Sequence, residues 1–127
     1  MRGHEASVTA LVFSPDGTTI ATGDAVIIAT VRLWDAATGQ QLHTLRGHSS
    51  RVWSVAFSVD SQRVFSASED KTLKVWSAAT GEELLTLRGH EEGLSCVAVS
   101  PDGRTVGSAS YDGTVKIWKT DNVAPAR

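Results

Sequence analysis

Short apolar or alternating segments, each bounded by turn-forming residues, follow one another along the whole chain. The middle third contains four of them, at residues 52–57, 63–67, 72–76 and 82–87. The segment 72–76 alternates in polarity and is rich in strand-forming residues, whereas 52–57 is mostly apolar, and both patterns are typical of strands. No stretch shows sustained helical spacing with capping residues. We therefore predict an all-β chain with four strands in each stretch of about 42 residues.

Several short words recur in phase and define an internal repeat. Gly-His occurs at 3–4, 47–48 and 89–90, and tryptophan follows at 34, 76 and 118, so that the spacings are 42 or 44 residues. Three longer words keep this register: Ser-Pro-Asp-Gly at 14–17 and 100–103, Ala-Ala-Thr-Gly at 36–39 and 78–81, and Thr-Leu-Arg-Gly-His at 44–48 and 86–90. A period of this size indicates a repeat architecture, in which each repeat is one structural unit packed on its neighbours.

The placing of these words resembles a known family. With Gly-His before the first strand and Trp34-Asp35 closing the third, the sequence resembles the WD-repeat family over residues 2–118. The resemblance implies a β-propeller whose blades are sheets of four antiparallel strands. It divides residues 1–118 into three blades, at approximately 2–45, 46–87 and 88–118, followed by a tail at 119–127. Three blades make an incomplete ring, because propellers typically close with about 4–8 blades.

Each repeat carries a histidine, a hydroxyl residue and a tryptophan at fixed offsets, and the last two repeats add an aspartate. The set comprises His4, Thr22 and Trp34 in the first repeat, His48, Ser66, Asp70 and Trp76 in the second, and His90, Ser108, Asp112 and Trp118 in the third. Serine, histidine and aspartate could also form a catalytic triad, but an enzyme needs one triad and this set recurs. The resemblance implies instead a hydrogen-bonded chain inside each blade, with no catalytic residue, cofactor or metal site.

The first repeat departs from this pattern after Asp24. Its segment is two residues longer, and Ile28 stands where the other repeats have Asp70 and Asp112. The polar set of the first repeat is therefore predicted to be incomplete, unless Asp24 reaches across. The apolar turn Val26–Ala29 is either an exposed patch that binds a partner or a degenerate segment that packs inward.

The resemblance also implies where partners bind, namely on the face that carries the Gly-His loops and the turns between second and third strands. The candidates by motif position are Thr9 in the first repeat, Arg51, Trp53 and Glu69 in the second, and Ser95 and Tyr111 in the third. Trp53 differs most from its counterparts, which are small and polar. Because tryptophan often anchors interfaces, Trp53 is either such an anchor or a residue packed between blades.

Three blades cannot close a ring by themselves, and three explanations are possible. The chain is a fragment of a larger propeller, a unit that self-associates through unpaired blade edges, or a remnant without a partner of its own. The residues after Trp118 include Pro125 and form a poor strand. We therefore predict only three strands in the third blade.

Composition narrows the range of partners and places. The net charge of −2 gives no electrostatic basis for binding nucleic acid or acidic membranes. A single cysteine, Cys96, cannot build a disulfide framework, and its apolar surroundings predict a small core residue. The longest apolar run, Ala25–Ala29, is far too short to span a bilayer, and the first residues lack the apolar segment of a signal peptide. A cytoplasmic location is expected.

These observations together predict a non-catalytic protein–protein interaction scaffold or regulatory module, whose partner the sequence does not identify. The alternative is a purely structural segment that only completes a ring. An enzyme is disfavoured, because the sequence contains no phosphate-binding glycine loop, no unrepeated triad and no metal-ligand cluster.

Overall fold

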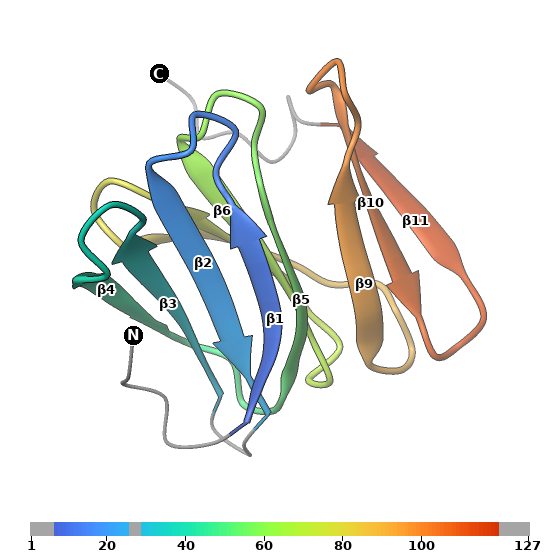
Figure 1. Ribbon diagram of the computed structural model, residues 1–127. Coiled ribbons are helices and arrows are strands. Elements are labelled where there is room, and N and C mark those ends of the chain that lie inside the picture. The colour runs from blue at the N-terminus through green and yellow to red at the C-terminus, as the bar shows by residue number, and fades with distance from the viewer. Residues whose placement is uncertain (1–6, 26–28, 120–127) are drawn as a thin grey trace.

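Three antiparallel sheets, arranged one beside the next, make up the protein (Figure 1). The computed structural model describes residues 7–25 and 29–119, and these contain strands but no helix that could cross a membrane. We call the sheets blades one, two and three. Blade one holds β1 (Val8–Phe13), β2 (Thr19–Asp24), β3 (Thr30–Asp35) and β4 (Gln41–Arg46); blade two holds β5 (Val52–Phe57), β6 (Arg63–Ser68), β7 (Leu73–Ser77) and β8 (Glu83–Leu87); blade three holds β9 (Leu94–Val99), β10 (Thr105–Ser110) and β11 (Val115–Lys119).

The strands follow the sequence pattern closely. The four segments predicted in the second repeat are β5 to β8, each within one residue of its predicted ends. Within a blade, every strand pairs with the next along the chain. Among the described residues blade three has three strands. The segment after Lys119, on which the prediction of only three strands rests, lies outside the described residues. The predicted all-β architecture of successive propeller blades is confirmed.

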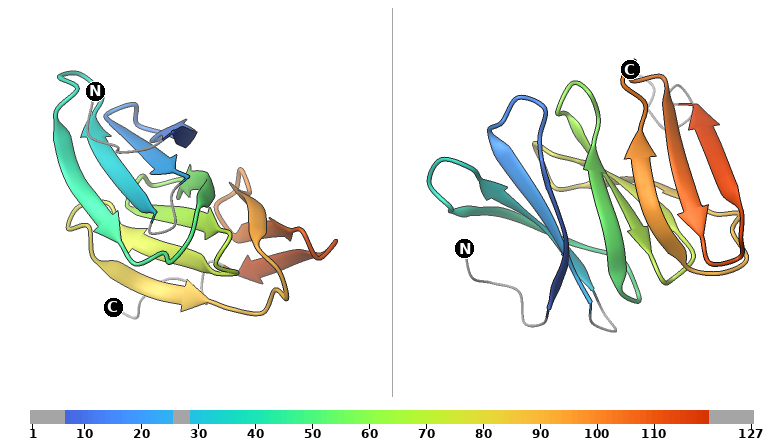
Figure 2. Two further views of the ribbon diagram at one scale, coloured as in Figure 1. Left: turned by 90° about the horizontal axis from the view of Figure 1, so that it is seen from below. Right: turned by 45° about the vertical axis from the view of Figure 1, so that its right-hand side comes forward.

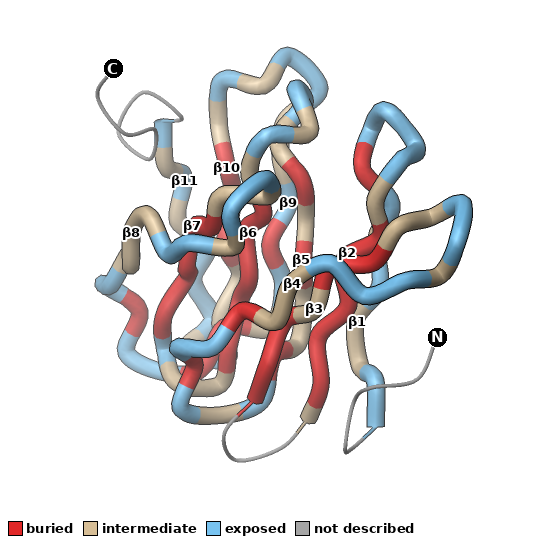
Figure 3. The backbone as a smooth tube through the Cα atoms, turned by 90° about the vertical axis from the view of Figure 1, so that its left-hand side faces the viewer, coloured by how far each residue is buried: buried red, intermediate tan, exposed pale blue. Residues whose placement is uncertain are grey.

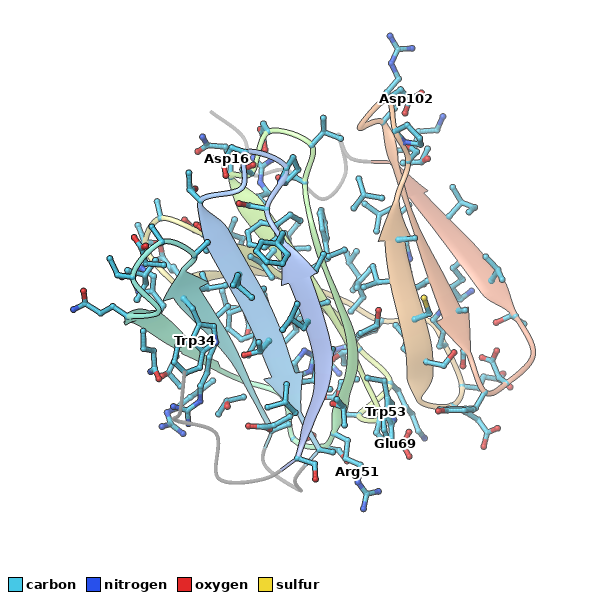
Figure 4. All side chains as sticks on the ribbon, viewed as in Figure 1. Asp16, Trp34, Arg51, Trp53, Glu69 and Asp102 are labelled. Carbon is cyan, nitrogen blue, oxygen red and sulfur yellow. The ribbon has the colours of Figure 1, made fainter. Side chains whose placement is uncertain are left out.

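An aspartate holds the turn between the first and second strands of each blade. Asp60 accepts a hydrogen bond from Ser58 Oγ at 2.6 Å, and Asp16 and Asp102 accept the same bond in the Ser-Pro-Asp-Gly turns at the upper end of the sheets in Figure 4. Glycine takes the left-handed position of the turn in blades one and three, but blade two uses Ser61 at a φ of 63°. The turn of blade two therefore closes without its glycine, at some conformational cost.

Apolar side chains between the sheets form two core clusters. One cluster joins blades one and two and includes Leu33 and Phe57, and the other joins blades two and three and includes Phe65 and Val97. The first strands β1, β5 and β9 lie side by side (Figures 1 and 2). The middle strands of the first two blades are largely buried (Figure 3). Each blade thus covers one face of the next.

The face of blade one that points away from blade two is uncovered by the described residues. Leu11 and Phe13 are 60% and 57% exposed on this face. Their counterparts in blade two, Val55 and Phe57, are only 8% and 6% exposed, because they pack in the core against blade one. The apolar pattern of the first strand is therefore the same in both blades, and only the presence of a preceding blade differs.

The far face of blade three is apolar in the same way. Val115 and Ile117 are 67% and 66% exposed, whereas their counterparts Leu73 and Val75 are fully buried in the core shared with blade three. The three sheets do not close into a ring. Both end faces of the stack, within the described part of the chain, are apolar.

Cys96 is exposed, so the prediction of a core residue is wrong. Its counterpart in blade two, Ser54, faces blade three, where the Oγ atom accepts a hydrogen bond from Val97 N at 3.1 Å. Cys96 occupies the same position in blade three, which no further described blade follows, and its Sγ atom lies 3.9 Å from Ser54 Oγ of blade two. The apolar sequence around Cys96 correctly indicated the burial of Leu94 and Val97. The burial of the cysteine itself depends on whether another blade packs beside it.

Candidate functional site

A buried chain of hydrogen bonds ties β6, β7 and the loop before β5 together in blade two. The Trp76 indole N–H donates to Ser66 Oγ at 2.8 Å, and Ser66 Oγ lies 2.6 Å from His48 Nε2. His48 Nδ1 lies 2.8 Å from Asp70 Oδ2. Because an ionised carboxylate only accepts hydrogen bonds, Nδ1 carries the proton, and Nε2 accepts the Ser66 hydroxyl proton. The side chains of these four residues thereby satisfy one another's hydrogen-bonding groups.

Asp70 is the acceptor at which this chain ends. Besides His48, it accepts hydrogen bonds from Thr72 N at 3.0 Å, from Thr72 Oγ1 and from Ser49 N at 3.0 Å. Burial raises the pKa of the Asp70 carboxyl, but these hydrogen bonds outweigh burial and hold the pKa well below its usual range. Asp70 is therefore ionised at neutral pH and acts as a fixed acceptor.

Blade three contains the same chain in a looser form. Trp118 donates to Ser108 Oγ at 3.0 Å, and Ser108 Oγ lies 2.8 Å from His90 Nε2. His90 Nδ1 lies 3.4 Å from Asp112 Oδ2 and 3.1 Å from Thr114 Oγ1, so the contact with the carboxylate is longer than in blade two. The side-chain hydrogen bond from Thr114 still holds the pKa of Asp112 well below its usual range.

Blade one shows part of the set. Trp34 donates to Thr22 Oγ1 at 2.8 Å, and both residues are buried. His4 lies outside the described residues. Of the apolar turn, Ala29 is buried in the core between blades one and two, whereas Ile28 and the two residues before it lie outside the described residues.

Asp24 takes over contacts that the aspartate of the turn makes elsewhere. It accepts hydrogen bonds from Thr30 N at 3.0 Å and from Thr30 Oγ1 at 2.9 Å. In blade two the same two bonds run from Thr72 to Asp70. A carboxylate placed before the insertion thus caps the third strand of blade one, in the way that a carboxylate within the turn does in blade two.

A second polar cluster, missed in the sequence, links the third and fourth strands of blade two. Lys74 is buried, and its ammonium donates to Glu83 Oε1 at 3.0 Å and to Thr86 Oγ1 at 2.8 Å. Thr86 Oγ1 in turn donates to Glu83 Oε2 at 2.8 Å. Burial raises the pKa of Glu83, but the hydrogen bonds from Lys74 and Thr86 lower it overall.

Blade one repeats this arrangement with other side chains. Arg32 Nη1 donates to Gln41 Oε1 at 3.2 Å, and Gln41 Nε2 donates to Thr44 Oγ1 at 2.6 Å. The signal in the sequence is a basic residue two positions before each tryptophan, at Arg32, Lys74 and Lys116. In blades one and two, this basic side chain on the third strand donates hydrogen bonds to side chains of the fourth strand.

The candidate partner-binding residues of blade two lie together at the lower end of the sheets (Figure 4). The Trp53 indole N–H donates to Glu69 Oε2 at 3.0 Å, and both residues are partly buried. The Glu69 backbone N–H donates to the Arg51 carbonyl, and Arg51 is exposed. Trp53 is therefore neither fully exposed nor part of the core, and its indole is held by a hydrogen bond to the turn that contains Glu69.

The other three candidates differ in how much of their polar surface is free. Tyr111 is 59% exposed, and its backbone N–H donates to the Gly93 carbonyl at the start of blade three. Ser95 Oγ donates weakly to a carbonyl of its own blade at 3.4 Å. Thr9 Oγ1 donates to Val52 O at 2.6 Å, so its hydroxyl joins blades one and two. Arg51 and Tyr111 are the most accessible of the six.

Gly93 brings the turn of Glu69 close to blade three. A Cβ atom at this position would lie 2.6 Å from Glu69 Oε2 and 3.0 Å from Glu69 Cα. The absence of a side chain therefore lets the two blades approach, which places the Trp53–Glu69 pair beside the loops of blade three.

The polar groups of the molecule fall into two kinds with different uses. The Ser66 and Ser108 hydroxyls are each engaged with an indole and an imidazole, so they hold the blades together. Within residues 7–25 and 29–119, no group of three or more metal-ligating side chains could hold an ion. The side chains of Arg51 and Tyr111 are instead exposed.

These features define a chain of β-propeller blades. The family model for "WD domain, G-beta repeat" matches residues 1–27, 39–77 and 81–119, which is more than half of the sequence. The chain therefore belongs to the WD-repeat family, whose members are in general non-catalytic modules of protein–protein interaction.

Similar proteins come from distant organisms and are much longer than this chain. The nuclear distribution protein PAC1-2 of Uncinocarpus reesii is 40% identical over 76 residues, which are 55% of this chain and 17% of that protein. The vegetative incompatibility protein HET-E-1 of Podospora anserina is 48% identical over 73 residues, 54% of this chain and 5% of that protein. The pre-mRNA-processing factor 19 homolog 2 of Arabidopsis thaliana is 52% identical over 54 residues, 42% of this chain and 10% of that protein. The chain thus spans a small part of each relative.

Proposed function

We propose that this chain is a non-catalytic interaction module that binds a protein partner at the end of the sheets where the Gly-His loops lie. The observation that carries the proposal is the grouping of Arg51, Trp53 and Glu69 at that end of blade two. Tyr111 of blade three bonds through its backbone to Gly93, which lies against Glu69. Arginine, tryptophan and tyrosine are the side chains that most often anchor protein interfaces.

The charge and shape of this end indicate what a partner offers. The Trp53 indole is oriented by its bond to Glu69, and a rigid aromatic side chain loses little conformational entropy on binding. The exposed Arg51 adds a positive charge at a residue whose carbonyl accepts a hydrogen bond from the Glu69 backbone N–H. A partner segment that combines an apolar side chain with a carboxylate would contact both the indole and the guanidinium.

The proposal includes further blades that cover the two apolar end faces. Leu11 and Phe13 on blade one, and Val115 and Ile117 on blade three, match positions that are buried where a neighbouring blade is present. Propellers close with about 4–8 blades. The extra blades belong to a longer polypeptide or to a second copy of this chain, and light scattering on a sizing column distinguishes the two.

The experiment compares proteins captured from a lysate by the native chain and by an Arg51→Ala, Tyr111→Ala double variant. A protein retained by the native chain and lost from the variant, with the thermal transition unchanged, supports the proposal. Equal capture by both argues against this end as the binding site.

The matched control is Gln62→Ala, which removes an exposed side chain from the turn at the opposite end of blade two. This variant is expected to capture the same proteins as the native chain. Loss of capture by the Gln62→Ala variant as well would mean that the partner does not bind specifically at the end that carries the Gly-His loops.

A further inference from the structure

Arg63, the first residue of β6, has a buried side-chain nitrogen without a hydrogen-bond partner. The atom is Nε, and it is the one buried side-chain nitrogen or oxygen within residues 7–25 and 29–119 for which no hydrogen bond is made. A guanidinium only donates hydrogen bonds, and a buried donor without an acceptor is rare in native proteins. Arg63 therefore holds a donor that the described part of the chain does not use.

The position of Arg63 differs between the three blades. The equivalent first residues of β2 and β10 are Thr19 and Thr105. The paired residue on the third strand differs as well, because Thr19 lies opposite Asp35 in blade one, whereas Arg63 lies opposite Ser77 in blade two. Blade two thus has a cation at this point, but not the carboxylate that blade one has on the neighbouring strand.

A hollow of about 560 Å³ lies beside Arg63. It is bordered by the turn between β5 and β6 and by the turn between β7 and β8, and its lining includes Arg63, Asp60, Thr80 and Glu82. This is the end of the sheets that Asp16 marks in Figure 4, whereas Trp53 marks the opposite end. Sites for small ligands commonly have volumes of about 300–1,000 Å³, so the hollow can hold two or three residues of a peptide.

Contacts with blade one fix both turns at the rim of the hollow. The Asp16 backbone N–H donates to Ser61 Oγ in the first turn at 3.2 Å. His43 Nε2 lies 2.9 Å from the carbonyl oxygen of Ala79 in the second turn. The shape of the hollow is therefore set before a ligand arrives, which lowers the entropic cost of binding.

The charges around the hollow restrict what it can bind. Asp60 accepts hydrogen bonds within its own turn, from Ser58 Oγ at 2.6 Å among others, and Glu82 is exposed. One guanidinium and two carboxylates give the lining an excess of negative charge, which disfavours a simple anion such as phosphate. A ligand of both signs suits it better, with a carboxylate for Arg63 and a cation for Asp60 and Glu82.

We propose that this hollow binds a short extended peptide segment in which a basic residue follows an acidic residue two positions later. Side chains two residues apart lie on the same face of an extended chain. The acidic side chain accepts hydrogen bonds from the Arg63 guanidinium, as in the forked pairing of arginine with a carboxylate, and the basic side chain lies against the two carboxylates. The site is at the opposite end of blade two from Arg51 and Trp53, so the proposal is independent of the partner-binding site described above.

The test measures binding of a fluorescein-labelled peptide, Gly-Glu-Ser-Lys-Gly with both ends capped, to the full chain by fluorescence anisotropy. A second peptide has Gln in place of Glu. We expect the Glu peptide to bind at least about tenfold more tightly, because its carboxylate forms a charge-assisted pair with Arg63. Arg63→Thr should abolish this preference, and the fold should tolerate the change because threonine occupies the equivalent position in both other blades.

A second variant keeps Arg63 but supplies it with a carboxylate from the chain itself. Ser77→Asp introduces on the neighbouring strand the residue that blade one has at Asp35, so it should weaken binding of the Glu peptide and raise the melting temperature.

The matched control is Arg88→Thr, which removes an exposed arginine beyond the end of β8 and should keep the preference of the native chain. No binding of the Glu peptide, equal affinity for both peptides, or an unchanged preference in Arg63→Thr overturns the proposal.

Discussion

Asp24 and Thr30 form a two-point contact that closes blade one across its longer turn: the Thr30 backbone N–H and hydroxyl both donate to the Asp24 carboxylate, at 3.0 and 2.9 Å. Both residues are buried. In blade two the equivalent contact uses an aspartate inside the turn, Asp70. The contact is thus kept although the residue that supplies it has changed place in the sequence.

Replacement of Asp24 by Ala is expected to lower the free energy of unfolding by about 2–3 kcal/mol, because it leaves the buried Thr30 groups without their acceptor. Urea unfolding followed by tryptophan fluorescence measures the change. A change below about 0.5 kcal/mol, the range of ordinary surface substitutions, would show that the contact contributes little.

The stability of the fold should depend on pH through Asp70. Its pKa is lowered in the folded state, so its contribution is complete above the unfolded value of about 3.9 and is lost as the pH falls below that value. Asp70→Asn should cost about 2 kcal/mol at pH 7, and the difference from the native chain should shrink towards pH 2. Unfolding curves at several pH values test this; a constant difference at all pH values would contradict it.

Lys71 offers a stabilising substitution. It has a φ of 75° in the turn between β6 and β7, where blade three has Gly113 at 86°. A residue with a side chain pays about 1 kcal/mol or more in this region, so Lys71→Gly should raise the free energy of unfolding by about 1 kcal/mol. The reciprocal variant, Gly113→Ala, should lower the free energy of unfolding. If both variants shift the melting temperature in the same direction, the backbone conformation of this turn does not account for the effect.

Gly93 and Gly107 make a matched pair for testing the approach of blades two and three. An added Cβ at Gly93 meets Glu69 at 2.6 and 3.0 Å, whereas at Gly107 the nearest atom, Ile117 Cδ1, is 3.7 Å away. Gly93→Ala should lower the free energy of unfolding by about 1–3 kcal/mol through overpacking.

Gly107→Ala should be neutral or slightly stabilising, because an alanine in a strand loses less conformational entropy than a glycine. Thermal unfolding of both variants under one condition makes the comparison. Equal destabilisation of the two would mean that the close contact at Gly93 is relieved by movement of the Glu69 turn.

The sequence predicted the fold well because the strands and turns of each repeat are decided locally. The alternation at β7 and the turn residues around Asp60 are sufficient to place their elements. The partners of Trp76 and His48 were implied by the family resemblance, and the distances agree with a continuous hydrogen-bonded chain.

The sequence did not predict features that depend on neighbouring blades. Cys96 and Ser54 occupy equivalent positions, but among the described residues only Ser54 has a further blade packed beyond it. Lys74 was not recognised because its two partners, Glu83 and Thr86, lie on the next strand, and no local pattern links them. The outcome at such positions is set by tertiary packing, which composition and periodicity do not describe.

The unlike apolar end faces of the stack make the described part of this chain resemble a bifunctional monomer in polymer chemistry. One end presents Leu11 and Phe13, the other Val115 and Ile117, and neither acts as the polar cap that terminates many repeat arrays. Head-to-tail addition through such ends gives a closed cycle when the rotation per unit returns to the start, and an open filament when it does not. If copies of the described part were added head to tail, the angle between neighbouring blades would decide whether growth stopped at a definite size or continued with concentration.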